Sequence, residues 1–166
     1  ARSALGPDRD LMVDGTWRFP LDDAIEFAHF LESQGAFWFE EPLASDDPDD
    51  FVRLRAATSV PIAIGENEMA VHGFRTWLRA GAVDIVQADA SRAGGITEVM
   101  KIAAEADAVG VGFAPHSWCD AVAITANAHA VAAARNGLTV EVDQTGNRFV
   151  EELLGAPLDR KSTRLN

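Results

Sequence analysis

Six ionisable side chains recur along this 166-residue chain at nearly even intervals. They are Asp14, Glu40, Glu66, Asp89, His116 and Glu141, separated by 26, 26, 23, 27 and 25 residues. Each stands at or just beyond the end of a short apolar run, and each interval is roughly the length of one strand and one helix. Carboxylates and imidazoles are the groups that act as general acids and bases. Any one of them could be a helix cap or a solvated loop residue, but the set of six predicts an active site.

The apolar runs are typical of short buried strands, and the stretches between them have helical spacing. We expect strands at Leu11 to Val13, Phe37 to Phe39, Ile62 to Ile64, Ile85 to Gln87, Val111 to Ala114 and Leu138 to Val142. Pro20 and Gly35 are suited to begin and end the first long helix. Strands that alternate with helices predict an α/β fold with a parallel sheet covered on both faces.

The fold class that follows is a partial (β/α)8-type, TIM-like barrel of about six βα units. In such barrels the carboxyl ends of the strands meet at one mouth, where active sites lie. A closed barrel has eight strands and about 250 residues, so we expect a fragment that lacks the N-terminal units. We expect the partial barrel domain to span residues 1–158. Residues 159–166 (DRKSTRLN) break the pattern and are expected to be a non-native or disordered tail.

Composition excludes several classes of protein. A single cysteine cannot form an internal disulfide, which excludes a disulfide-stapled secreted scaffold. No apolar run reaches the roughly 20 residues of a membrane span. The formal net charge of −12 argues against binding to a nucleic-acid backbone. We therefore expect a cytoplasmic protein that acts on a small molecule, with neither a nucleic acid nor a membrane as partner.

Short motifs at the strand ends give a more specific indication. LMVDGTW, WFEEP and IGEN resemble the three metal-ligand segments of the enolase superfamily's barrel domain. DASRAGGITE followed by FAPHSW resembles the Asp and His segments of the mandelate racemase branch, within the mandelate racemase/muconate lactonizing enzyme family. The resemblance covers residues 8 to 155, in order and with the family's spacing. It implies a barrel domain that follows an N-terminal capping domain, which would precede residue 1.

The resemblance implies that Asp14, Glu40 and Glu66 are ligands of one Mg²⁺ ion. The chemistry of these groups agrees, because three carboxylates directed at one point raise one another's pKa unless a cation neutralises them. Magnesium takes hard oxygen ligands and keeps positions open for water or substrate. Glu41, beside a ligand, is expected to pair with a neighbouring cation.

The same resemblance assigns catalytic roles to Asp89, His116 and Glu141. Asp89 and His116 would form a hydrogen-bonded dyad in which the carboxylate fixes the imidazole tautomer and raises its basicity. Glu141 would donate a hydrogen bond to the developing enolate oxygen, which requires a raised pKa. The alternative for His116 is a capping histidine after Pro115.

Three further residues are expected to contact the substrate. Thr16 replaces an amide of the common Asp-x-Asn pattern, which puts the substrate contacts in question rather than the metal ligands. Arg92 stands where some relatives carry Lys and is expected to hold Asp89 or another carboxylate. Trp118 is expected either to line the substrate pocket or to pack its indole ring into the protein interior.

The implied reaction is Mg²⁺-dependent removal of the proton α to a carboxylate, through a stabilised ene-diolate. In this branch the commonest outcome is dehydration of a sugar acid, and racemisation, epimerisation and cycloisomerisation are the alternatives. A non-catalytic α/β scaffold and a barrel of unrelated chemistry, such as a metal-dependent aldolase, also remain open. The strand that carries the opposite-face Lys would precede residue 1, so we expect the fragment alone to be inactive. Relatives in this family are often homo-oligomers, and only this analogy makes the whole protein a candidate homo-oligomer.

Overall fold

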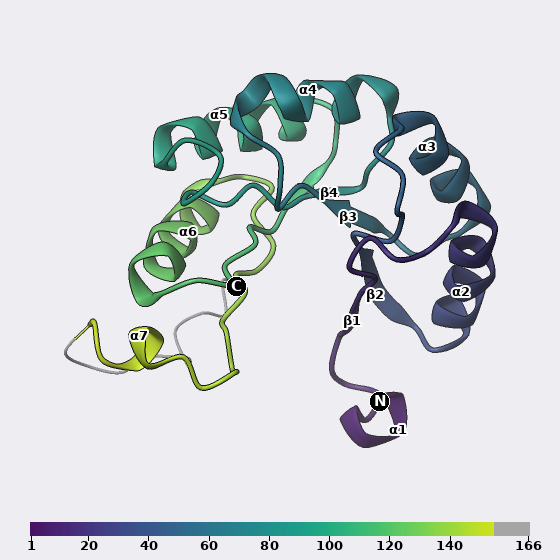
Figure 1. Cartoon of the computed structure of the whole chain (residues 1–166), viewed down its shortest axis with the longest axis horizontal. Helices are drawn as coiled ribbons and strands as arrows, with labels where there is room; N and C mark the ends of the chain where they lie inside the picture. The colour runs from purple at the N-terminus through teal and green to yellow at the C-terminus, as the bar shows by residue number, and fades with distance from the viewer. Residues whose placement is uncertain (155–166) are drawn as a thin grey trace. The chain divides into compact units, whose positions relative to one another are not determined.

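The computed structural model describes residues 1–154, in which strands and helices alternate along the chain (Figure 1). Five strands form one parallel sheet in the order β1-β2-β3-β4-β5. Their bounds are β1 Leu11–Asp14, β2 Ala36–Glu40, β3 Ile62–Ile64, β4 Ile85–Val86 and β5 Gly112–Phe113. The sequential strand order and the intervening helices confirm the α/β class expected from the sequence.

Within residues 1–154, five long helices and two single helical turns accompany the strands. They are α1 Arg2–Leu5, α2 Leu21–Ser33, α3 Pro48–Ala57, α4 Ala70–Ala80, α5 Ile96–Asp107, α6 Ala121–Ala133 and α7 Arg148–Glu151. The start of α3 is fixed by the Asp47 carboxylate, which accepts from the N–H of Asp49. The Asp120 carboxylate caps α6 in the same way. None of the helices among the described residues is long and apolar enough to cross a membrane.

The prediction of a sixth strand at Leu138 to Val142 is wrong. The stretch makes one isolated parallel bridge, between Gly137 and Phe113, and the N–H of Leu138 donates to the carbonyl of Phe113. No strand is assigned at residues 138–142. A β-branched, alternating pattern forms a strand only where a neighbour supplies a ladder of hydrogen bonds, and here the ladder with β5 ends after one bridge.

The chain divides into two compact units, and the first comprises Ala1–Ile64 and Thr76–Ile85. Its core contains Phe39, Leu54 and Ile62, all with no exposed surface. Strands β1 and β2 pair in parallel with Val13 opposite Phe39 and Asp14 opposite Glu40. The register therefore places the last residues of both strands side by side.

The second unit has residues 65–75 and 86–154 as its described part. Its core is built by Phe74, Val99, Ile102 and Phe113, which are completely buried. The N–H of Ala114 donates to the carbonyl of Val86, so the end of β4 lies beside the segment that follows β5. The expected boundary at residue 158 and the tail at residues 159–166 lie outside the described residues.

Candidate active site

Two of the expected metal ligands, Asp14 and Glu40, are direct neighbours in the first unit. They end strands β1 and β2 and are register partners. Paired residues of adjacent parallel strands project to the same face, with backbones about 4.8 Å apart. Asp14 Oδ1 accepts from the N–H of Thr16 at 2.7 Å, and Glu40 Oε2 accepts from the indole of Trp38 at 3.0 Å. These bonds orient two hard oxygen donors on one face of the sheet.

The turns after β1 and β2 hold three non-glycine residues in the left-handed region of backbone space. Thr16 has φ 46°, Trp17 has φ 55° and Glu41 has φ 37°. The Trp17 N–H donates to the Glu41 carbonyl at 2.8 Å, and the Trp17 indole donates to the Glu41 carboxylate at 2.9 Å. Such a conformation costs about 1–3 kcal/mol per residue and persists only where surrounding contacts impose it. Thr16, an expected substrate contact, is therefore held in a fixed turn beside Asp14.

In the second unit the structure brings Asp89 and His116 together. Nδ1 of His116 lies 3.0 Å from Oδ2 of Asp89, and the two residues are 5% and 1% exposed. The backbone explains their proximity, because the N–H of His116 donates to the carbonyl of Gln87 in the neighbouring segment. An expected metal ligand of the same unit, Glu66, places its Oε2 3.8 Å from Nε2 of His116.

The charge state of the pair follows from its surroundings. For Asp89, burial acts to raise the pKa, but hydrogen bonds from His116, Asn127 and Ser91 outweigh it and lower the pKa to about 2. For His116, burial acts to lower the pKa, but the bond to Asp89 and the charges of Glu66 and Glu141 outweigh it and raise the pKa. Asp89 is therefore ionised near neutral pH, and Nδ1 of His116 carries the proton that it donates to Oδ2.

One residue of this cluster was missed by the sequence analysis. Asn127 of α6 is fully buried, and its Nδ2 donates to Oδ1 of Asp89 at 3.0 Å. A signal was present, because Asn127 is an amide within the largely apolar stretch AVAITANAHAVAA, whose other polar residues are Thr125 and His129. A buried amide in such a helix must find polar partners, but the sequence does not show which residues they are.

The remaining expected site residues of the second unit lie on loops. Glu141 Oε2 accepts from the N–H of Ser117 at 2.7 Å, which anchors the carboxylate beside the dyad segment. Trp118 is 57% exposed, so the expectation of a packed indole is wrong. Arg92 donates to Asn67 Oδ1 at 2.7 Å and to the Glu66 carbonyl at 3.3 Å. Its guanidinium is thus tied to the loop after β3, and Asp89 is held by other donors.

No group of three or more His, Cys, Asp and Glu side chains within residues 1–154 lies close enough together to hold a metal ion. The donor pair Asp14 and Glu40 nevertheless has the chemistry that Mg²⁺ requires, since both are carboxylates and both project from one face. The third expected ligand, Glu66, belongs to the second compact unit.

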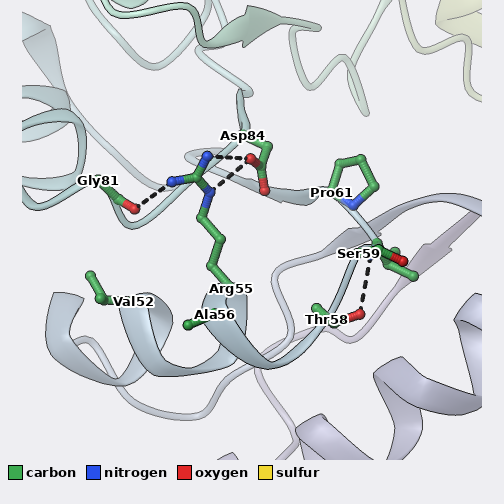
Figure 2. A pocket seen from close by; sticks show the side chains of 9 residues that line it. Val52, Arg55, Ala56, Thr58, Ser59, Pro61, Gly81 and Asp84 are labelled. Atoms are coloured by element: carbon green, nitrogen blue, oxygen red, sulfur yellow. Dashed lines mark hydrogen bonds and ion pairs between the residues drawn. The ribbon is translucent and has the colours of Figure 1, made fainter.

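A hollow of about 390 Å³ lies at the other end of β3, between the last turn of α3 and the start of the strand (Figure 2). Arg55 crosses it, donating to Asp84 at 2.7 Å and to the Gly81 carbonyl at 2.9 Å. None of the expected site residues lines it. Polar groups at the amino ends of barrel strands serve stability, and Arg55 and Asp84 satisfy each other, so this hollow is not the candidate site.

Comparison with known proteins identifies relatives over nearly the whole chain. The D-galactarolactone cycloisomerase of Agrobacterium fabrum is 36% identical over 166 residues, which is 95% of this chain and 44% of that protein. The D-galactonate dehydratase of Xanthomonas euvesicatoria is 37% identical over 140 residues, covering 84% of this chain and 37% of the relative. The chain thus spans less than half the length of the curated relatives that it matches.

Solved structures agree with the fold. The 3,6-anhydro-D-galactonate cycloisomerase of Zobellia galactanivorans superposes with a TM-score of 0.86 at 41% identity, over 91% of this chain and 43% of that one. A mandelate racemase/muconate lactonizing enzyme-like protein of Rubrobacter xylanophilus superposes with a TM-score of 0.90 at 33% identity, over 96% and 41% of the two chains. The arrangement of strands and helices is that of the barrel domain in these proteins.

A family model described as Enolase C-terminal domain-like matches residues 1–166. The strand-end carboxylates, the Asp89–His116 pair and these similarities lead to one conclusion. This chain belongs to the enolase C-terminal domain-like family, and its relatives are mandelate racemase/muconate lactonizing enzyme proteins.

Proposed function

We propose that the full-length protein that carries this chain removes the proton α to the carboxylate of a sugar acid and then eliminates the β-hydroxyl group as water. The observation that carries the proposal is the buried hydrogen bond between Asp89 and His116. Support also comes from the relatives named D-galactonate dehydratase.

His116 is the proposed base and acid. Its Nδ1 is committed to Asp89, so Nε2 is the nitrogen that can take the α-proton, and the ionised Asp89 stabilises the imidazolium that results. The C–H electron pair then resides in an ene-diolate. Expulsion of the β-hydroxyl uses this pair, and protonated Nε2 returns its proton to the departing oxygen, so that water leaves. The enol product tautomerises to a 2-keto acid.

Asp14, Glu40 and Glu66 are the proposed ligands of Mg²⁺. The register pair Asp14 and Glu40 supports this assignment, because two carboxylates side by side favour a shared cation over mutual repulsion. When bound, Mg²⁺ supplies positive charge that stabilises the substrate carboxylate as negative charge develops on it. The residues of this chain orient the donor oxygens through the bonds from Thr16 and Trp38.

The remaining roles fall to residues around these groups. Glu141 is proposed to donate a hydrogen bond to the enolate oxygen, from a carboxyl group anchored on the Ser117 N–H. Thr16, Arg92 and Trp118 are proposed to contact the substrate, and the 57% exposure of Trp118 leaves its indole accessible for that contact. We further place the protein in the cytoplasm.

Cycloisomerisation is the second candidate. Two relatives carry that activity in their names, the D-galactarolactone and the 3,6-anhydro-D-galactonate cycloisomerases. Removal of an α-proton by His116 would serve either reaction, and the two differ in which bond to oxygen breaks afterwards.

The test is a panel of aldonic and aldaric acids and their lactones, incubated in D₂O with the full-length protein and Mg²⁺. Proton NMR follows α-deuterium incorporation, and a 2-keto acid assay follows dehydration. We expect a 2-keto acid from at least one substrate, and none from the His116→Asn variant. The control is His129→Asn, which removes an exposed imidazole of α6. A product isomeric with its substrate by mass spectrometry would favour the cycloisomerase, whereas a product lighter by one water indicates dehydration. Neither exchange nor product anywhere in the panel would refute the proposal.

A further inference from the structure

Asn127 occupies an unusual position, as a fully buried amide that bonds four different groups. Its Nδ2 lies 3.0 Å from Asp89 Oδ1, 3.0 Å from the carbonyl oxygen of His116 and 2.9 Å from Ser117 Oγ. Its Oδ1 accepts from the N–H of Ala90 at 2.9 Å. The two N–H hydrogens of the amide are therefore shared among three acceptors, and its oxygen accepts one bond.

The chemistry of these partners fixes which way the amide faces. The N–H of Ala90 can only donate, so it requires the oxygen of Asn127. The ionised Asp89 carboxylate and the His116 carbonyl can only accept, so they require the nitrogen. A flipped amide would place its oxygen against both acceptors. Asn127 thus has one orientation in which it fits.

The same contacts link the two segments that carry the dyad. Ala90 follows Asp89 in the segment after β4, and His116 with Ser117 forms the segment after β5. Asp89 Oδ1 also accepts from the N–H of Ser91 at 2.8 Å, which leaves Oδ2 for Nδ1 of His116. The carboxylate cannot rotate without breaking its bonds to Asn127 and Ser91.

We propose that Asn127 is the positioning residue of the dyad: it holds the Asp89 carboxylate and the His116 backbone in the one arrangement that aligns the imidazole for proton transfer. The inference rests on the proposed function, in which His116 moves the proton. Asn127 acts through Asp89 and His116 and touches no substrate.

The test replaces Asn127 with Ala in the full-length enzyme and measures α-proton exchange. Misplacing a catalytic group lowers the rate of the chemical step, so we expect kcat to fall about tenfold or more while KM stays within about threefold. The matched control is Asn136→Ala. Asn136 donates to the carbonyls of Ala103 and Val111 in the same unit, and neither carbonyl belongs to the dyad. This variant is expected to keep kcat within about twofold.

A second readout does not depend on turnover. Nitrogen-15 NMR of histidine-labelled enzyme reports which ring nitrogen of His116 carries the proton. We expect the Nδ1–H form in the native protein, and in Asn127→Ala a mixture of both tautomers that Asn136→Ala does not show. If Asn127→Ala does not fold, Asn127→Ser is measured instead, since its hydroxyl retains one donor and should give a smaller change in the same direction.

The outcomes separate the two proposals. Native kcat and a native His116 spectrum in a folded Asn127 variant would overturn the positioning role. If native enzyme exchanges no α-proton in any acid, the proposed function fails, and the NMR comparison alone decides whether Asn127 fixes the tautomer. Equal losses of kcat in the Asn127 and Asn136 variants would also overturn the inference, because both would then reflect general destabilisation.

Discussion

Asp14 ends strand β1 directly opposite Glu40, the last residue of strand β2. Two like charges at paired positions of neighbouring strands destabilise a sheet unless a cation lies between them. We therefore predict that millimolar Mg²⁺ raises the melting temperature of the full-length protein. A ligand at a hundred times its Kd stabilises the folded state by about 2.7 kcal/mol.

Variants at the proposed ligands make this Mg²⁺ prediction specific. Glu40→Gln and Glu66→Gln are each expected to remove most of the Mg²⁺-dependent shift in melting temperature, as measured by differential scanning calorimetry with and without EDTA. Glu26→Gln removes an exposed acid of α2 and should leave the shift intact. An equal shift in all four proteins would mean that Mg²⁺ binds elsewhere.

The second prediction concerns stability in acid. The pKa of Asp89 is lowered from 3.8 to about 2 in the folded protein, so its ionised form stabilises the fold above pH 3.8. That stabilisation is lost as the pH falls from about 4 towards 2, and it amounts to about 2 kcal/mol. Urea unfolding of wild type and Asp89→Asn across this range measures it. The gap between their unfolding free energies should narrow as the pH falls, and a gap independent of pH would contradict the assignment.

A third prediction separates the role of Asp89 in activity from its role in stability. Asp89→Asn keeps the shape of the side chain but presents an amide to Nδ1 of His116, which favours the wrong tautomer. We expect kcat for α-proton exchange at neutral pH to fall by about a hundredfold or more, within the range for loss of general-base catalysis. Asp107→Asn, at a 38% exposed acid paired with Arg135, should leave kcat unchanged. Steady-state kinetics with the substrate found in the panel decides between these results.

The fourth prediction tests the packing of the turn after β1. A Cβ at Gly15 would lie 2.8 Å from the backbone of Pro42 and 3.0 Å from the ring of Phe39. Gly15→Ala is expected to destabilise the protein by about 1–3 kcal/mol, because neither neighbour can yield easily. At Gly73, inside α4, the added methyl meets only the flexible end of Glu68, and alanine improves helix propensity. The melting temperature of Gly73→Ala should therefore be no lower than that of wild type. If Gly73→Ala melts at a lower temperature than Gly15→Ala, the prediction is contradicted.

Much of the fold could be predicted from local pattern. The apolar run expected at Ile62 to Ile64 forms β3 with the same bounds. Leu138 to Val142 is also rich in β-branched residues yet forms no strand, because pairing depends on what lies beside a segment rather than on its own residues.

The candidate site was predictable to a similar extent. The even spacing, which reflects the repeat of the βα unit, predicted that these side chains lie at one mouth. The pairing of Asp89 with His116 was implied by the family resemblance, and the structure shows Asp14 beside Glu40 and Asp89 beside His116. The contacts of Asn127 were not predictable, because Asn127 lies 38 positions after Asp89 in the sequence and only the packed fold brings the amide to the carboxylate. For the same reason the sequence could not show that Arg92 bonds to Asn67.

The left-handed backbone at Thr16, Trp17 and Glu41 has a consequence for ligand recognition. These residues are locked into their turns by contacts that exist before any ligand arrives, so little loop entropy is lost there on binding. If Thr16 contacts the substrate as proposed, a rim held in this way would discriminate between stereoisomers by shape, and its selectivity would be preorganised rather than induced.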